Sequence, residues 1–234
     1  MKQRRSELLR NFIAANSLVL SIYLVLLLFS FILIFSYDRV NLHLFINQMV
    51  GSRGLNALFY YITYLGDGFV GICMLLLILF FNIRKFVYTG LSFLFASMFA
   101  QYLKHYVFKD VERPWNIFQH ESHDMSLRLV EGVDTHFHQS FPSGHATQAF
   151  AIFLCLVFTT SNTSLKVIFF SVAVLTAFSR VYLSQHWLSD VVAGSLIGFL
   201  FSALFYFFPY QHPGLKSLNR PLFPIRQKRA GQHS

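Results

Sequence analysis

The sequence predicts an all-α integral-membrane bundle of six transmembrane helices, with a short interfacial helix between the first two. Two features of the composition indicate this fold: apolar residues make up 55% of the 234 residues, and charged residues only 12%. Soluble domains contain about 25% charged residues, so a soluble fold of this composition could not cover its own apolar surface. The apolar residues also gather into runs of about 20, the length with which an α-helix crosses the hydrocarbon core of a bilayer.

The first predicted span covers residues 14–36 and follows a basic N-terminal segment. This run is too long for the apolar core of a signal peptide, and no small-residue cleavage site follows it, so we expect it to be retained. Five further spans are predicted at 67–82, 86–108, 142–160, 165–182 and 187–208. The whole chain, residues 1–234, is interpreted as a single membrane domain.

The segments between the spans differ in character. Residues 37–56 carry apolar side chains at roughly helical spacing, which predicts the short interfacial helix. Residues 109–141 form the one substantial hydrophilic loop, and residues 209–234 form a basic tail that could anchor to anionic lipid headgroups. Cys73 and Cys155 lie inside apolar runs, where we expect them to pack as small hydrophobes rather than to form a disulfide.

The basic residues predict the orientation of the chain. Six spans place both termini on one side, and twelve of the 19 Lys and Arg residues then fall on that side, in the termini and in tight turns at 84–85 and 161–166. The positive-inside rule therefore favours cytoplasmic termini and an outer-face loop at 109–141. Because membrane orientation accounts for the net charge of +9, we expect no nucleic-acid partner.

The junction between the last two spans carries an arginine, a histidine and an aspartate. His186 and Asp190 are four residues apart, so on a helix they share a face and can touch. An aspartate that accepts the Nδ1 proton of a histidine leaves Nε2 free as a nucleophile or base. Arg180 could reach the same ligand only if the chain turns, which predicts one helix ending near Tyr182 and another beginning near Gln185. A guanidinium beside a neutral imidazole suits attack on a phosphoryl group.

A second polar stretch, Pro142-Ser143-Gly144-His145, begins the fourth span. Unpaired backbone N–H groups and the positive end of the helix dipole make such a helix start a cradle for an anion. Gly144 would let the backbone approach an oxyanion closely, and His145 could protonate a leaving alkoxide. The simpler alternative is an ordinary serine N-cap followed by an incidental histidine, but the neighbouring junction of arginine, histidine and aspartate favours the anion site.

Two more basic residues, Lys104 and Arg113, are expected on the same outer face. Their alternative explanation is snorkelling, which is common for long basic side chains near the ends of spans. With these residues, four separate stretches of the chain converge on one membrane surface.

The remaining histidines are less informative. The loop holds four of them, His120, His123, His136 and His138. A metal site is conceivable there, but their spacing matches no established ligand pattern, so we expect a solvated loop and no metal. His43 and His105 are expected at the membrane interface rather than in a catalytic role.

The three polar stretches resemble the three-part signature of the type 2 phosphatidic-acid phosphatase superfamily. Its Pro-Ser-Gly-His part is matched at 142–145, and its Ser-Arg-x5-His-x3-Asp part at 179–190. The first part is usually Lys-x6-Arg-Pro; here eight residues separate Lys104 from Arg113, and three separate Lys109 from it. Lys104 is the favoured lysine, and the order of spans agrees with the family along nearly the whole chain.

The resemblance implies a mechanism and a set of site residues. His186 would attack phosphorus and form a phosphohistidine, Asp190 would hold the imidazole in the right tautomer, and His145 would be the general acid. The phosphoryl oxygens would be bound by Lys104, Arg113, Ser143, Gly144 and Arg180. No metal or other cofactor is implied, because fixed cations and backbone dipoles can stabilise the transition-state charge.

The sequence therefore predicts an integral-membrane phosphatase for a lipid phosphate or diphosphate, of the undecaprenyl diphosphate, lipid A phosphate or phosphatidylglycerophosphate type. We expect it in a bacterial inner membrane, with the active site on the periplasmic face. A phosphotransferase with another acceptor than water is an alternative, and a transporter is the non-enzymatic one. A transporter's polar groups should line a path at mid-membrane, whereas these gather at one surface.

Overall fold

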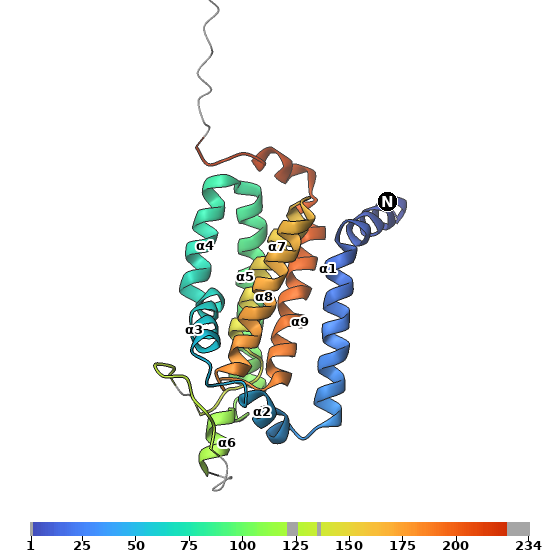
Figure 1. The fold of residues 1–234 in the computed structure, drawn as a ribbon. Coiled ribbons are helices and arrows are strands. Elements are labelled where there is room, and N and C mark those ends of the chain that lie inside the picture. The colour runs from blue at the N-terminus through green and yellow to red at the C-terminus, as the bar shows by residue number, and fades with distance from the viewer. Residues whose placement is uncertain (1, 121–125, 135–136, 224–234) are drawn as a thin grey trace, which may run out of the picture.

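The computed structural model describes residues 2–120, 126–134 and 137–223, and the regular elements within them are all helical. The six long helices are α1 (Lys2–Ser36), α4 (Gly68–Phe81), α5 (Ile83–Tyr102), α7 (Gly144–Thr159), α8 (Thr163–Tyr182) and α9 (Leu188–Phe205) (Figure 1). These six correspond to the six apolar runs of the sequence. The all-α bundle is confirmed.

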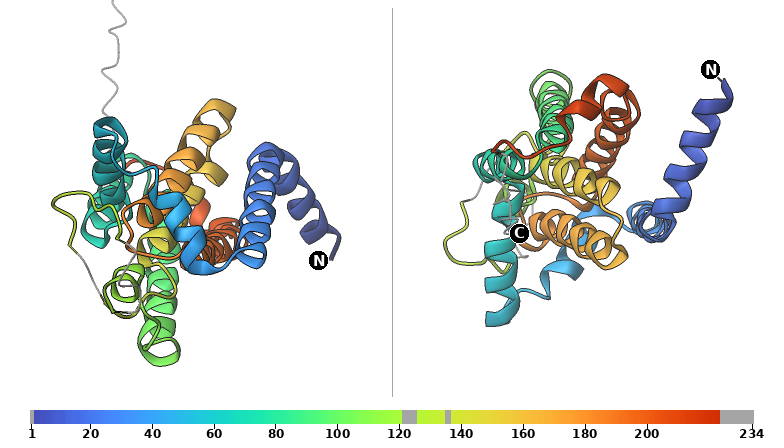
Figure 2. Two further views of the ribbon diagram at one scale, coloured as in Figure 1. Left: turned by 60° about the horizontal axis from the view of Figure 1, so that its bottom comes forward. Right: turned by 90° about the horizontal axis from the view of Figure 1, so that it is seen from above.

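The bundle is organised around α7, which packs against α5, α8 and α9 (Figure 2). Small residues allow the helices to approach closely: Ala146 and Ala149 of α7 are fully buried. Gly198 of α9 meets α7 so closely that a Cβ on it would lie 2.6 Å from the Cβ of Phe150. Because α7 is enclosed by protein, its face toward lipid is small.

Within the described ranges, length and apolarity identify four single helices as able to cross a membrane: α1, α5, α8 and α9, with the short π-helical turns that extend α5 and α9. A fifth span is possible if α3 (Arg53–Ile62) and α4 form one broken span, since they bend by 66° at a short break. With 16 residues, α7 is about 24 Å long and shorter than the roughly 30 Å hydrocarbon core. The expected number of six spans therefore stays a prediction.

A short helix was expected within residues 37–56, and the structure has one there, followed by a second helix that was not expected. The first is α2 (Arg39–Asn47), whose N-terminus is capped by the Asp38 carboxylate, and the second is α3. Between them Gly51 has φ +137°, a conformation that favours glycine and breaks the helix. After α3 the chain passes through the one-turn helix η1 (Thr63–Gly66) into α4.

α1 stands at the side of the bundle and is held to it by few polar contacts (Figure 1). The Tyr23 hydroxyl lies 3.0 Å from Ser195 Oγ on α9. About two turns nearer the N-terminus of α1, the buried Lys166 Nζ donates to Ala15 O and Asn16 Oδ1, both at 2.6 Å. Lys166 was expected only as a positive charge in a cytoplasmic turn, and the structure adds this contact with α1.

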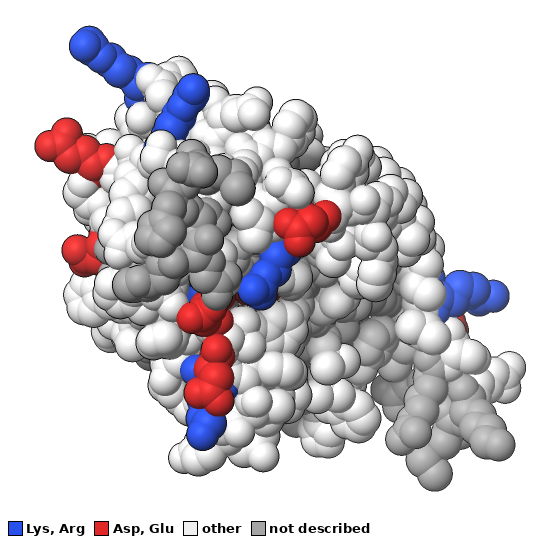
Figure 3. All heavy atoms as spheres, turned by 90° about the horizontal axis from the view of Figure 1, so that it is seen from below, with Lys and Arg blue, Asp and Glu red and all other residues white. Residues whose placement is uncertain are grey.

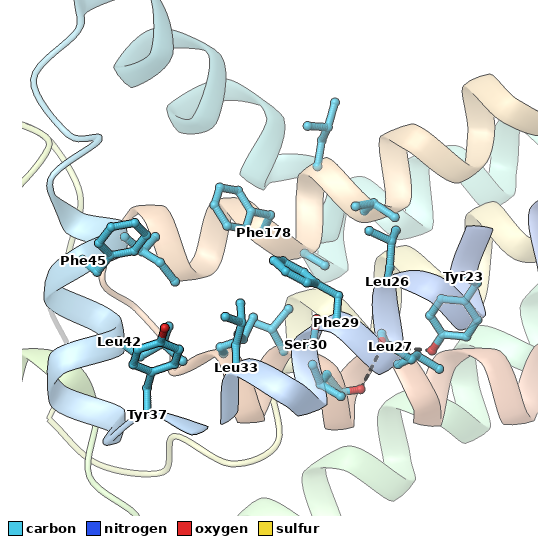
Figure 4. Close-up of a pocket in the computed structure, with 18 of the residues that line it drawn as sticks. Tyr23, Leu26, Leu27, Phe29, Ser30, Leu33, Tyr37, Leu42, Phe45 and Phe178 are labelled. Carbon is cyan, nitrogen blue, oxygen red and sulfur yellow. Dashed lines mark hydrogen bonds between the residues drawn. The ribbon is translucent and has the colours of Figure 1, made fainter. Parts of the chain in front are cut away.

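A cavity of about 700 Å³ separates α1 from α8 and α9. Its walls are almost entirely apolar, and side chains of α1, including Leu26, Leu27 and Leu33, face Phe178 of α8 across it (Figure 4). The loose packing of α1 follows from this gap.

The two ends of the bundle differ. The N-terminus of α1 lies at one end together with the C-terminal helices η3 (Tyr206–Tyr210) and η4 (Pro213–Leu218) (Figure 1). The opposite end carries α2, the short helix α6 (Pro114–His120) and the described part of the 109–141 loop, and acidic and basic side chains gather on its face (Figure 3). Cys155 is buried as expected, whereas Cys73 is exposed on α4, so the packing expected for it is wrong.

Candidate active site

At this second end the structure brings together the ends of four helices. The C-terminal ends of α5 and α8 meet the N-terminal ends of α7 and α9, and each of these ends carries at least one of the predicted site residues. The turn between α8 and α9, residues 183–187, is buried at the centre.

His186 lies in this turn and is 1% exposed. Its Nδ1 is 3.4 Å from Oδ2 of Asp190, so the predicted contact is present. The expected reason for it is wrong, because α9 begins at Leu188 and His186 precedes the helix. Asp190 is instead fixed by its own helix start: its Oδ2 accepts a hydrogen bond of 3.0 Å from the backbone N–H of Trp187.

Ser140, which sequence reasoning missed, contacts both His186 and Asp190. Ser140 is fully buried; its Oγ donates to Asp190 Oδ2 at 2.5 Å and lies 3.4 Å from His186 Nδ1. Ser189 Oγ donates to the other carboxylate oxygen of Asp190 at 3.1 Å. Nothing in the sequence signals Ser140, since it lies 46 residues before His186 and outside both matched motifs.

The backbone of the turn is held from several directions. Arg180 O accepts hydrogen bonds from the N–H groups of Gln185 and His186, at 2.9 and 3.1 Å. Arg113 donates through Nη1 to Gln185 O at 3.1 Å and through Nε to His138 O at 3.0 Å. Arg113 therefore joins the loop to the turn that carries His186, and the predicted turn after Tyr182 is present.

Three cations surround this turn: Arg113, Lys104 and Arg180. Arg180 is 8% exposed, and its Nη1 donates to Thr63 Oγ1 at 2.8 Å. Its Nε–H is buried and has no hydrogen-bond partner among the described residues, so a donor remains for a ligand. Lys104 is half-buried, whereas Lys109 is exposed. A Cβ on Gly144 would meet Lys104 Nζ at 4.0 Å, so Lys104 faces the start of α7.

The charges around His186 favour its neutral form. Burial lowers the pKa of His186 well below its usual 6.5, and the positive charges of Arg113, Lys104 and Arg180 and the nearby His145 lower it further. Burial also lowers the pKa of Arg113 from its ordinary value, while the charge of Asp190 raises it. A neutral imidazole next to fixed cations is the state that can attack an electrophile.

The stretch at 142–145 forms the start of α7, as predicted. Ser143 is the N-cap of α7 and its Oγ accepts from Ala146 N at 3.4 Å, while its own N–H donates to Asp190 O at 3.0 Å. His145 is half-buried in the first turn of the helix. The N-terminal ends of α7 and α9 are thus joined directly.

Two glycines enclose this start of α7, and sequence reasoning missed both. A Cβ on Gly66 would lie 2.7 Å from His145 O, and one on Gly194 would lie 2.5 Å from Ser143 O. Any larger residue would push η1 or α9 away from the turn. The close packing of η1 and α9 therefore fixes the position of Ser143 and His145.

The structure describes only some of the other histidines. Among the described residues, no group of three or more His, Cys, Asp and Glu side chains could hold a metal ion. His123 and His136, and the side chain of His120, lie outside what the structure describes. His105 is exposed, whereas the side chain of His43 is 2% exposed and lies inside the protein. The position of both at the membrane interface stays a prediction.

The large cavity beside α1 is separate from this site. On α8, Thr176 and Arg180 face α3 and η1 through their hydrogen bonds, whereas Ala177 and Phe178 face the cavity. The site and the cavity therefore lie on different faces of α8.

Three cations, a helix N-terminus and a neutral histidine beside a fixed carboxylate are the groups that a site requires to bind a tetrahedral oxyanion and present a nucleophile to it. Its place at one end of an apolar helix bundle is that of a membrane protein. The family model of the PAP2 superfamily matches residues 85–213, more than half of the chain, and the chain belongs to this superfamily.

Known relatives agree with this assignment. An undecaprenyl-diphosphatase of Sulfolobus acidocaldarius is 34% identical over 148 residues, which cover 62% of this chain and 66% of that protein, just under two thirds of its length. The crystal structure of Aquifex aeolicus LpxE has a TM-score of 0.61 and 25% identity, covering 71% of this chain and 93% of that one. A PAP2-type phosphatidylglycerolphosphate phosphatase of Bacillus subtilis shares the fold, with a TM-score of 0.55 and 22% identity, covering 80% of this chain and 94% of that one.

Proposed function

We propose that this protein is an integral-membrane phosphatase that hydrolyses a lipid phosphate or diphosphate through a phosphohistidine. The observation that carries the proposal is the buried His186, whose Nδ1 faces the carboxylate of Asp190 at 3.4 Å while Lys104, Arg113 and Arg180 lie around it. The neutral imidazole then has Nε2 free for attack, and the cations supply the charge that a phosphoryl group requires.

In the first step Nε2 of His186 forms a bond to phosphorus and the bond from phosphorus to the lipid oxygen breaks. His145, at the start of α7, donates a proton to that departing oxygen. In the second step water attacks phosphorus, gives a proton to His145, and breaks the bond to Nε2. Phosphate leaves, and both histidines return to their starting states.

The phosphoryl oxygens are bound by side chains and by backbone. Lys104 and Arg180 offer charged donors, among them the unpaired Nε–H of Arg180. Ser143 adds its hydroxyl and Gly144 its backbone N–H at the start of α7, where the helix dipole is positive. Gly144 suits this position because its missing side chain leaves space toward Lys104. We assign the first-motif lysine role to Lys104, since Lys109 is exposed.

We propose that the substrate is a lipid whose phosphate reaches the outer face of a bacterial inner membrane, with both termini of the protein in the cytoplasm. The described residues offer cations and dipoles for phosphate, and the relatives include an undecaprenyl-diphosphatase and LpxE. Undecaprenyl diphosphate, a lipid A phosphate and phosphatidylglycerophosphate are the substrates to test. We expect tolerance among small headgroups, with a long hydrocarbon chain improving the apparent affinity.

The test is phosphate release by purified protein in detergent, from each of these three lipids, in EDTA and with and without vanadate. We expect release in EDTA, inhibition by vanadate, and loss of turnover in His186→Ala and His145→Ala, with both variants still folded by circular dichroism. A phosphoenzyme trapped by acid quench should form in wild type and be absent in His186→Ala.

Two results would contradict the proposal. Near-normal turnover of His186→Ala would rule out the phosphohistidine, and activity lost in EDTA and restored by Mg²⁺ or Zn²⁺ would rule out a metal-independent reaction. Transfer of the phosphoryl group to an added lipid or sugar in preference to water would make the protein a phosphotransferase.

A further inference from the structure

The turn that carries His186 is held from behind by α2. His43 and Asn47 lie one helical turn apart on the inner face of α2, and both point to the hydroxyl of Ser184. His43 Nε2 lies 3.0 Å from Ser184 Oγ, and Asn47 Nδ2 donates to the same oxygen at 3.2 Å. All three side chains are buried.

Asn47 also ties the outer loop to this group. Its Oδ1 accepts from the backbone N–H of Arg128 at 2.8 Å, and its Nδ2 donates to Arg128 O at 2.9 Å. The side chain of Asn47 therefore joins α2 both to the loop, at Arg128, and to the catalytic turn, at Ser184. With Ser184 as its third partner, Asn47 has no room to move without breaking a hydrogen bond.

Ser184 adopts a backbone conformation that its side chain does not favour. Its φ is +55°, in the left-handed region where a residue with a Cβ is less stable than glycine by about 1 kcal/mol or more. Glycine would relieve that strain and would also lose the hydroxyl. A serine at this position is therefore explained by what its hydroxyl binds, not by the turn.

The ring of His43 is enclosed as a neutral group. It packs edge-on against Trp187, with ring centroids 5.3 Å apart, and tilted against Phe118 at 6.1 Å. Burial lowers the pKa of His43 to about 4, so the ring stays uncharged at neutral pH. His43 thus contacts residues on both sides of His186 in the chain: Ser184 by a hydrogen bond and Trp187 by ring packing.

We propose that His43 and Ser184 are positioning residues for His186: α2 fixes the turn through the Ser184 hydroxyl and so holds the imidazole in line with the phosphoryl group. The inference rests on the proposed function, since it assigns His186 as the nucleophile. Neither residue touches the phosphoryl group in this assignment. Ser184 acts on His186 through the backbone of Gln185, which joins the two residues. His43 acts through its hydrogen bond with Ser184 and through its ring contact with Trp187.

The test separates position from stability. Ser184→Gly and Ser184→Ala both remove the hydroxyl, but glycine relieves the φ strain and alanine keeps it. We expect Ser184→Gly to unfold at the same or a higher temperature than wild type and Ser184→Ala at a similar or lower one. Both should lose kcat by about 10-fold with KM within about twofold, because small displacements of a reacting group cost rate rather than binding.

His43 gives a second, independent arm. His43→Gln places an amide nitrogen where Nε2 lies and should keep most of the turnover, whereas His43→Leu cannot hydrogen-bond and should fall about 10-fold in kcat. Phe45→Leu is the matched control on α2, since Phe45 is 71% exposed, and it should turn over like wild type.

The outcomes are distinguishable. If wild type and His186→Ala are equally inactive on every lipid phosphate, the proposed function fails. If wild type is active and depends on His186, but Ser184→Gly and His43→Leu keep full kcat, the positioning role is wrong. A loss of kcat in Ser184→Ala without one in Ser184→Gly would assign the effect to backbone strain and also overturn it.

Discussion

Ser140 Oγ and Asp190 Oδ2 lie 2.5 Å apart, and the same carboxylate oxygen lies 3.4 Å from Nδ1 of the neutral His186. The serine hydroxyl therefore stabilises the charged carboxylate, which orients the imidazole in the proposed mechanism. Ser140→Ala should reduce kcat by about 10-fold, because a buried charge-assisted hydrogen bond contributes about 1.5–3 kcal/mol. Steady-state kinetics with thermal unfolding in detergent measures this. Unchanged kcat would show that Trp187 N and Ser189 hold Asp190 unaided.

Asp190→Asn should reduce kcat more than substitution of the supporting residues Ser140, Ser184 or His43. The amide keeps the shape but allows the wrong imidazole tautomer, and the comparable change in hydrolase triads costs about 10⁴ in kcat. Phosphoenzyme formation should slow to the same degree, because the loss precedes attack on phosphorus. A loss smaller than about 10-fold would mean that Asp190 serves the fold and not the nucleophile. Asp110→Asn is the control, since Asp110 is an exposed carboxylate of the loop.

Gly194→Ala should displace the start of α7, since the new Cβ would lie 2.5 Å from Ser143 O, a backbone atom that cannot yield alone. We expect lower thermal stability together with loss of activity. Gly90→Ala is the matched control: Gly90 is within α5, and a Cβ there meets nothing within 4 Å. That variant should be as active as wild type and at least as stable, given alanine's higher helix propensity. Equal behaviour of the two variants would contradict the close packing of α9 on α7.

Acid should destabilise the protein beginning near pH 6.5. His186 and His43 have lowered pKa values in the folded state, about 4 for His43, so below 6.5 the unfolded chain binds protons that the folded one does not. Above pH 6.5 the two histidines therefore do not lower the free energy of unfolding. Below pH 6.5 each of them lowers it by about 1.4 kcal/mol per pH unit, until the pH reaches the pKa of that histidine in the folded protein. Thermal unfolding of wild type and His43→Gln between pH 7.5 and pH 5 measures it, in roughly half-unit steps. The variant should show a shallower decline, and equal slopes would contradict the assignment to His43.

The orientation can be tested in intact cells or spheroplasts. Ser126 lies in the loop at the same end of the bundle as the candidate site, and Ser217 lies in η4 at the opposite end; both are exposed. In a background where Cys73 and Cys155 are replaced by serine, an impermeant thiol reagent should label Ser126→Cys and leave Ser217→Cys unlabelled. The reverse pattern would place the site in the cytoplasm, and the proposed substrate pool with it.

The sequence by itself determined the class of fold and most of the candidate site. Composition and apolar runs predict a helical membrane bundle because a chain with so few charges cannot cover an apolar surface in water. The site residues His186, Asp190 and Arg180 are predictable because they are close in the chain, and local spacing decides which of them can meet. The start of α7 is predictable for the same reason, since an N-cap and its anion cradle are properties of four consecutive residues.

Only the tertiary structure decided which distant residues support that site. The candidate site is contacted from other segments of the chain by Ser140, Gly66, Gly194 and His43. The contacts of the two glycines and of His43 depend on how closely η1, α9 and α2 pack. His43 illustrates the reason. A histidine on a short amphipathic helix is equally compatible with the membrane interface and with the protein interior. Which one it occupies depends on whether α2 lies against the α8–α9 turn, and that contact joins segments 141 residues apart.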